Sequence, residues 1–357
     1  MKKVDLILLV IVSLVTLFGF FMVYDASSFI SFRDFGDKYH YVKDQSVWMI
    51  LGFLGMFFFT KFDYHKLYTI ALPLLLVALG LLFAVFLPGV GVGVLGAHRW
   101  INLRLTILQP AEFVKLTLAI YLAAWFSSKE RGRFLPFILL LGLVIGLIML
   151  EPDMGTAIII LFEALILFFL SGGNLLYFGL LAPIVAIVGY ILILLEPYRA
   201  KRLSTFFNSS DGATGASYHV HQILIALGSG GLTGVGIGNS LQKYAYLPEN
   251  TTDSIFAIIA EELGLVGSTV LFFVLLLIVW RGMLIATRAK DLFGKYLASG
   301  IVAFLGMQMI INLGAQTALI PLTGVPLPFI SYGGSALIID LCSVGILLNI
   351  GRQGHQV

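Results

Sequence analysis

The sequence predicts an all-α, polytopic membrane protein with ten transmembrane helices and both termini in the cytoplasm. Hydrophobic residues make up 59% of the 357-residue chain and charged residues 11%, whereas soluble domains contain about 45–50% and about 25%. The apolar residues also gather in runs of about 20, the length of helix that crosses a hydrocarbon core of about 30 Å. A soluble fold could not bury this much apolar surface, so we expect lipid to be the solvent of these runs.

Ten apolar runs account for the predicted helices, and they lie at about 5–24, 45–60, 67–87, 106–126, 134–150, 154–171, 175–195, 254–280, 296–317 and 335–351. The first run follows Lys2 and Lys3 and has no clear small-residue cleavage site after it, so we interpret it as a retained signal anchor. A polar break at 151–153 separates the fifth and sixth runs. Counting two helices there gives an even number of spans, which places both termini on one side of the membrane. We interpret the whole chain, 1–357, as a single membrane domain.

Lysine and arginine in short loops predict which side is cytoplasmic. With the N-terminus inside, the inner segments carry twelve of these residues and the short outer loops carry five, which places both termini in the cytoplasm. The segment at about 196–253 then becomes a large extracytoplasmic loop between helices 7 and 8. This loop contains a predicted amphipathic helix near His219 to Leu227 and enough apolar residues to pack, so we expect it to be functional.

Several classes of function are excluded by composition and spacing. The net charge of +3 is too small and too scattered for a nucleic-acid partner. Cys342 is the only cysteine, so there is no intramolecular disulfide. His98, His219 and His221 do not have the spacing of a zinc site. The glycine-rich stretch from Gly228 to Gly238 lacks the strand and lysine of a phosphate-binding loop, which argues against nucleotide binding.

Charged residues at membrane depth are costly and usually face a partner or a cavity. Glu112 and Lys115 are three residues apart, so they share a helix face and can pair. This pair is either an internal ion pair that lets the helix insert, or part of a cavity wall that offers a cation to an anionic substrate, with Arg99 close upstream. Two further acids, Glu151 and Asp153, flank Pro152. Asp153 is predicted to cap the next helix, whereas Glu151 is available for a cation or hydrogen-bonding site.

Asp253 lies where the long loop becomes an apolar helix. It is either an N-cap carboxylate or a general base at the wet end of a cavity, with a pKa tuned by its surroundings. The segment Pro321 to Ser335 contains three prolines and three glycines, which preclude a regular helix. Because lipid cannot solvate an open backbone, this segment must line a cavity or lie at the interface. We expect the remaining charges within spans to have structural roles: Asp5, Glu163 and Asp340.

These segments resemble the SEDS family of peptidoglycan glycosyltransferases, which includes RodA, FtsW and SpoVE. The resemblance covers nearly the whole chain, and ten spans with a large outer loop agree with the family. The motifs that carry it are Arg99-Trp100-Ile101, Gln109-Pro110-Ala111-Glu112 to Lys115, Glu151-Pro152-Asp153-Met154-Gly155-Thr156, Leu247-Pro248-Glu249 to Asp253, Ala260-Glu261-Glu262-Leu263-Gly264 and Pro326-Leu327-Pro328-Phe329-Ile330-Ser331-Tyr332-Gly333-Gly334-Ser335.

The resemblance implies an enzyme of the bacterial cytoplasmic membrane that polymerises lipid II into glycan strands at the outer face. An acceptor 4-hydroxyl attacks the anomeric carbon of the donor with inversion and expels a polyprenyl pyrophosphate. By family position Asp253 is the general base. The substrate-binding residues that we infer are Arg99, Glu112, Lys115, Glu151, Arg199, Arg202, Lys243 and Ser331. A divalent cation, Mg²⁺ or Mn²⁺, is a further expectation, with Asp253, Glu112 and Glu151 as candidate ligands.

The branch within the family is indicated by Gly236 to Lys243 and its short spacing to Leu247, which favour an FtsW-like enzyme of cell division over a RodA-like enzyme of elongation. Either branch implies a class B penicillin-binding protein as partner, together with divisome or elongasome membrane proteins. Two places depart from the family pattern. The usual His-Thr-Asp-Phe is replaced here by Thr251-Thr252-Asp253-Ser254, and the early Tyr24-Asp25-Ala26-Ser27-Ser28 differs from the usual Tyr-Ser-Ala-Ser.

Two other classes of function compete with the enzyme. A lipid II flippase would also need a cationic cavity open to lipid, but it should carry ionisable groups near the bilayer midplane. The charged motifs instead cluster at the outer ends of spans, which favours the enzyme. A scaffold that only recruits partners would not explain a segment broken by glycine and proline beside several charges.

Overall fold

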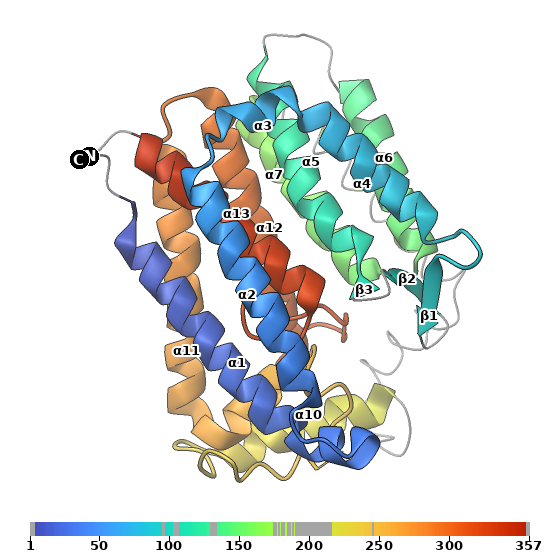
Figure 1. The fold of residues 1–357 in the computed structure, drawn as a ribbon, viewed down its shortest axis with the longest axis vertical. Helices are drawn as coiled ribbons and strands as arrows, with labels where there is room; N and C mark the ends of the chain where they lie inside the picture. The colour runs from blue at the N-terminus through green and yellow to red at the C-terminus, as the bar shows by residue number, and fades with distance from the viewer. Residues whose placement is uncertain are drawn as a thin grey trace.

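The computed structural model describes residues 4–94, 97–102, 107–128, 134–173, 216–244 and 246–354, together with residues 177, 179, 183, 187 and 189. The chain forms an elongated bundle of helices (Figure 1). The start of α1 and the end of α13 lie together at one end, which we call the terminal end. Helix α10 lies at the opposite end, which we call the loop end.

The described helices are α1 (Leu6–Phe35), α2 (His40–Lys61), α3 (His65–Thr69), α4 (Ala71–Ala84), α5 (Pro110–Ser127), α6 (Phe134–Leu150), α7 (Met154–Leu170), α10 (Ala216–Gly230), α11 (Ile255–Thr287), α12 (Leu292–Gln316) and α13 (Gly334–Gln353). In the described part of the chain, five are long and apolar enough to cross a membrane, namely α1, α2, α11, α12 and α13. The mostly helical prediction is confirmed. The run at 175–195 lies largely outside the described residues, so the count of ten and the orientation stay predictions.

Several expected helices differ from their predicted extents, and α1 runs to Phe35 where its predicted run ends near residue 24. The run at 67–87 is divided into α3 and α4 at Ile70. Pro73 explains the division, because proline lacks the N–H that a continuous helix needs and is tolerated only in the first turn. The run at 106–126 becomes helical only at Pro110, which occupies the first turn of α5.

The expectation of an all-α fold is wrong between α4 and α5, where the chain forms a small antiparallel sheet in the order β1-β2-β3. Its strands are β1 (Gly91–Val94), β2 (Ala97–Asn102) and β3 (Ile107–Leu108). Gly91 must lack a side chain, because a Cβ there would lie 1.9 Å from the carbonyl oxygen of Val85. The hydropathy pattern could not reveal this sheet, since its strands are only two to six residues long.

Helix α12 lies at the centre of the bundle and contacts α5, α7, α11 and α13. Helix α5 is buried along almost its whole length, Lys115 included. Large apolar side chains are exposed on the outer helices, for example Leu14, Leu54 and Phe273. An apolar exterior around a buried polar interior is the arrangement expected of a protein whose surroundings are hydrocarbon.

Candidate functional site

Asp253 lies just before α11, which begins at Ile255 with Ser254 as its N-cap. Asp253 is therefore not the N-cap residue; Ser254 occupies that position, without a side-chain cap hydrogen bond. The Asp253 side chain is half-buried, and Thr252 Oγ1 donates a hydrogen bond to its Oδ1 at 3.1 Å. Its Oδ2 faces Gly324, where an added Cβ would lie 3.9 Å away. Asp253 is thus a carboxylate held at the loop end beside open, glycine-containing backbone.

A row of amides on α12 holds the backbone of Asp253 in place. Asn312 Nδ2 and Gln316 Nε2 donate to the Asp253 carbonyl oxygen at 2.9 and 2.7 Å. Asn312 Nδ2 also lies 2.8 Å from the carbonyl oxygen of Val325, and Gln308 Nε2 donates to Pro326 at 3.1 Å. These amides were not among the residues predicted from the sequence. Their spacing of four residues within an apolar run was the signal, since it places all three on one helix face.

Residues 317–333, which we call the α12–α13 connection, form an irregular segment that packs against Asp253. The Tyr332 amide donates to the Thr251 carbonyl at 2.8 Å. Ser331 is buried, and its Oγ accepts a hydrogen bond from the Leu327 amide at 2.8 Å. The Ser331 hydroxyl therefore closes a turn inside the connection, while the substrate-binding role predicted for it stays a prediction. Gly19 of α1 makes room for the same turn, because a Cβ there would lie 2.5 Å from Ile330 Cα.

Arg99 and the acidic motif at 151–153 meet next to the α12–α13 connection. Arg99 donates to the carbonyl oxygens of Glu151, at 3.0 Å, and Pro152. Asp153 accepts from the Thr156 amide at 3.1 Å, which confirms its predicted role as the cap of α7. A Cβ on Gly155 would lie 2.4 Å from Val325 Cγ2. The motif therefore packs directly on the connection that also contacts Asp253.

Glu151 is fully buried, and its two carboxylate oxygens have no hydrogen-bond partner among the described residues. Burial raises the pKa of Glu151 from its ordinary value of 4.5 to about 8, and nearby Asp153 adds to this while Arg99 opposes it. A carboxyl group is more easily buried neutral than charged. Glu151 is accordingly a protonated acid at neutral pH, placed next to the Arg99 guanidinium.

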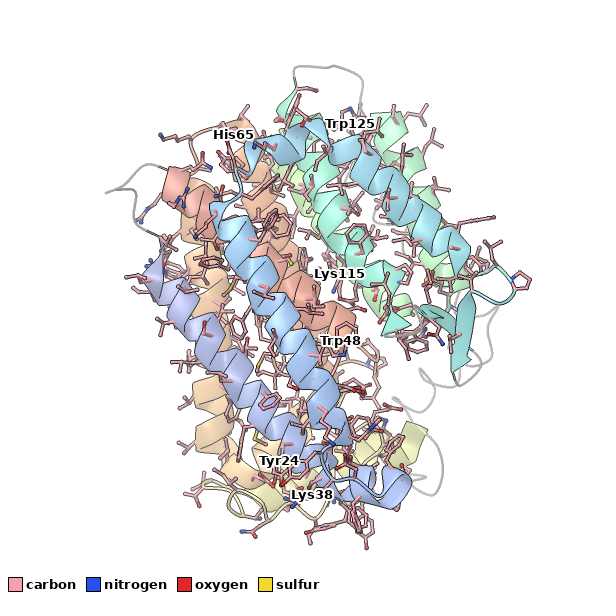
Figure 2. All side chains as sticks on the ribbon, in the orientation of Figure 1. Tyr24, Lys38, Trp48, His65, Lys115 and Trp125 are labelled. Carbon is pink, nitrogen blue, oxygen red and sulfur yellow. The ribbon has the colours of Figure 1, made fainter. Side chains whose placement is uncertain are left out.

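The ion pair predicted from the spacing of Glu112 and Lys115 is present, with Nζ and Oε2 2.8 Å apart. Lys115 Nζ also donates to Gln308 Oε1 at 2.6 Å. Both charged side chains are buried, and Figure 2 shows Lys115 inside the bundle, away from both ends. This geometry matches an internal ion pair. The structure does not bring Lys115 to a surface that an anionic substrate could reach.

Lys243 is also buried and paired, at the loop end. Its Nζ lies 3.0 Å from Asp25 Oδ1 and 3.2 Å from Glu262 Oε1. Burial disfavours the ammonium, but the two carboxylates outweigh it and raise the pKa of Lys243. Asp25, one of the departures from the family pattern, therefore joins α1 to the loop and to α11. The predicted substrate residues Arg199 and Arg202 lie outside the described residues.

The candidate ligands for a divalent cation do not gather. In the part of the chain that the structure describes, no group of three or more His, Cys, Asp or Glu side chains could hold a metal ion. The Glu112 carboxylate is already paired with Lys115, and Glu151 is buried and protonated. Only Asp253 keeps partial access to solvent. The described residues thus do not fit a preformed Mg²⁺ or Mn²⁺ site, and the cation stays a prediction.

Comparisons with known proteins identify the family of the chain. A family model described as "Cell cycle protein", for FtsW, RodA and SpoVE, matches residues 5–356. The chain is 38% identical to stage V sporulation protein E of Bacillus subtilis, over 98% of each chain. It is 41% identical to a probable peptidoglycan glycosyltransferase FtsW of Coxiella burnetii, over 94% of this chain and 92% of that one.

Two solved structures share the fold at 28% identity. One, described as "Structural coordination of polymerization and crosslinking by a peptidoglycan synthase complex", has a TM-score of 0.80 and covers 99% of this chain and 98% of that one. The other is the rod shape determining protein RodA of Thermus thermophilus, with a TM-score of 0.73 and 99% of each chain covered.

Proposed function

The chain belongs to the FtsW, RodA and SpoVE family of multi-pass cytoplasmic membrane proteins, and from this premise we propose that it polymerises lipid II into glycan strands at the outer face of the membrane. The observation that carries the proposal is the placement of Asp253. It is a half-buried carboxylate at the loop end, and its backbone is fixed by Asn312 and Gln316. Relatives named as probable peptidoglycan glycosyltransferases match over nearly the whole chain, which supports the same activity.

In the proposed reaction Asp253 is the general base. Its carboxylate takes the proton of the acceptor 4-hydroxyl as the oxygen attacks the anomeric carbon of the donor. The new glycosidic C–O bond forms as the bond from that carbon to the pyrophosphate oxygen breaks, with inversion, and the polyprenyl pyrophosphate leaves with the bonding electrons. A sugar hydroxyl has a pKa far above 7, so a positioned base accelerates the step by roughly 10²–10⁴-fold.

The leaving pyrophosphate needs positive charge nearby, and we assign this role to Arg99, which is partly exposed where Lys115 and Lys243 are buried and paired. Its bonds to the Glu151 and Pro152 carbonyls use two of the five N–H groups of a guanidinium. Because Glu151 is protonated at neutral pH, it does not cancel this charge. We assign the same role to Arg199 and Arg202 on the basis of the family resemblance.

For the branch and the partner, we propose an FtsW-like enzyme of cell division that works with a class B penicillin-binding protein. Relatives named FtsW and SpoVE support the division branch. The similarity to a chain from a peptidoglycan synthase complex that couples polymerisation to crosslinking supports a partnered enzyme. A class B penicillin-binding protein would supply the crosslinking of the strands that this chain makes.

A lipid II flippase is the second candidate, and one observation favours it. Buried charges occur inside the bundle, with Lys115 beside Glu112 and with Glu163 and Asp340 also buried. Ionisable groups at membrane depth are typical of transport pathways. Lys115 is nevertheless paired with both Glu112 and Gln308, so its charge is not available to a transported substrate. The Asp253 side chain, in contrast, keeps partial access to solvent.

One experiment separates the two candidates. The purified chain is placed in liposomes with lipid II, alone and with its class B penicillin-binding protein, and both glycan polymer and lipid II translocation are measured. We expect polymer in wild type and none above background in Asp253→Ala. Translocation of lipid II without polymer would favour the flippase. Polymer that is undiminished in Asp253→Ala would contradict the assignment of the base.

A further inference from the structure

The side chain of His219 on α10 is hydrogen-bonded to the N-cap residue of α11. Its Nε2 is hydrogen-bonded to Ser254 Oγ at 2.7 Å. With the ring proton on Nδ1 the hydroxyl donates, and with the proton on Nε2 the ring donates. Ser254 is fully buried and is the N-cap residue of α11. The contact joins two elements 35 residues apart in sequence, at the residue that directly follows Asp253.

The peptide that carries Asp253 is therefore fixed from two sides. On one side, Asn312 and Gln316 of α12 bind its carbonyl oxygen. On the other side, Ser254 is held by His219 through its hydroxyl and by the Glu249 carbonyl through its amide, at 3.1 Å. No histidine occurs within the segment 247–258 itself. An imidazole nevertheless contacts this peptide, and it comes from α10.

We propose that His219 is a positioning residue for the glycosyl transfer, acting on Asp253 through Ser254. The inference rests on the proposed function, because it presumes that Asp253 is the base. A general base must lie within hydrogen-bonding reach of the proton that it takes, and small misplacements are costly in rate. Losing the His219 contact removes the partner of a buried hydroxyl and frees the segment between Glu249 and α11 to shift.

The test uses the full chain with its class B penicillin-binding protein and measures kcat and KM for polymerisation of lipid II. We expect His219→Ala to lower kcat by roughly 10- to 100-fold with little change in KM, because the residue places the base and does not bind substrate. His219→Gln should restore most of the rate, since an amide can donate to or accept from the serine hydroxyl. His221 of α10 is exposed, so His221→Ala serves as the matched control and should keep the wild-type rate.

A double-variant cycle tests the route through Ser254. Ser254→Ala should lower kcat as His219→Ala does, and the double variant should be no slower than either single variant, because residues that act through one contact are not additive. Thermal unfolding of each variant in detergent monitors folding. The proposal is overturned if His219→Ala has the kinetics of His221→Ala. It is also overturned if His219→Gln is as slow as His219→Ala and both unfold at lower temperature, since packing alone then explains the loss.

Asp253→Asn distinguishes the failure of this inference from the failure of the proposed function. If Asp253→Asn abolishes polymerisation while His219→Ala keeps the wild-type rate, only the positioning role is overturned. If Asp253→Asn polymerises lipid II at the wild-type rate, Asp253 is not the base, and the positioning role falls with it.

Discussion

At the scale of single residues, the two acids Asp253 and Glu151 have different surroundings, and the site depends on that difference. Asp253 keeps partial access to solvent, and the α12 amides bind its backbone carbonyl. Glu151 is sealed inside, without hydrogen-bond partners among the described residues. Burial in a low-dielectric interior penalises the charged form, so Glu151 is the acid that stays protonated. One acid is thus available for proton transfer, and the other leaves Arg99 positively charged in its surroundings.

The protonation of Glu151 makes the stability of the protein depend on pH. Its pKa is about 8 in the folded chain against an ordinary 4.5, so its contribution is fully present below about pH 4.5 and is lost as pH rises through about 8. The expected slope in this window is a loss of about 1.4 kcal/mol of unfolding free energy per pH unit. Glu151→Gln mimics the protonated acid and should remove this slope.

Thermal unfolding in detergent at pH 5, 6.5 and 8 compares the pH dependence of stability in wild type and in Glu151→Gln. The exposed Asp44 provides the control, because Asp44→Asn should keep the wild-type pH dependence. An unfolding temperature of Glu151→Gln that falls with pH as steeply as that of wild type would show that Glu151 is already ionised when folded.

The residue contacts that depend on local spacing were predictable from the sequence. Asp153 caps α7 and Glu112 pairs with Lys115 because each pair of partners is three residues apart, and helix geometry alone brings such residues together. Lys243 illustrates what could not be predicted. Its partner Asp25 is 218 residues away in sequence, so only the packing of α1 against the loop end reveals the pair.

At the scale of the elements, α11 is interrupted at Gly264, which has φ 66° and ψ −167°. Residues 231–235, which follow α10, form backbone hydrogen bonds with α11 on both sides of Gly264. The Val235 amide donates to the Glu261 carbonyl at 3.0 Å, and the Leu265 amide donates to the Gly231 carbonyl at 2.9 Å. These backbone hydrogen bonds satisfy groups that the broken helix would leave unpaired. The apolar pattern of 254–280 predicted one helix and could not show this break, because the break depends on backbone hydrogen bonds between residues 261–265 and the distant residues 231–235.

Gly264→Ala should therefore destabilise the protein by more than about 2 kcal/mol, because this backbone conformation is essentially restricted to glycine. The new Cβ would also lie 2.3 Å from the Gly234 backbone nitrogen, which cannot move without breaking the loop. Thermal unfolding in detergent measures the loss. Gly146→Ala in α6 is the control, since a Cβ there meets nothing within 4 Å and alanine is favoured over glycine in a helix by about 0.5–1 kcal/mol. Equal stability of the two variants would contradict the role of the break.

At the scale of the whole molecule, hydropathy predicted the positions of the helices because lipid requires a long apolar run for each span. It could not predict the small sheet. The prolines and glycines of 321–335 predicted the irregular backbone of the α12–α13 connection, but not its contacts with distant segments. Figure 2 places Tyr24 and Lys38 at the loop end and His65 and Trp125 at the opposite end. The bias of lysine and arginine predicts that the loop end lies at the outer face.

Cysteine labelling in intact cells tests that orientation. The chain has one cysteine, Cys342, and it is buried, so wild type provides a nearly silent background. Lys38 and Lys66 are both exposed. We expect a membrane-impermeant maleimide to label Lys38→Cys in intact cells and Lys66→Cys only after the membrane is permeabilised. The reverse pattern would place Asp253 on the cytoplasmic side, where lipid II polymerisation at the outer face could not use it.

The most direct measurement of the central claim is the rate of glycan polymerisation from lipid II by Asp253→Asn, which keeps the shape of the side chain but cannot accept a proton. Asp37 lies beside Lys38 at the same end of the bundle, so Asp37→Asn is the matched control. If Asp253 is the general base, kcat falls by roughly 10²–10⁴-fold in Asp253→Asn and is unchanged in Asp37→Asn, while both variants remain folded. A rate for Asp253→Asn equal to that of wild type would contradict the account.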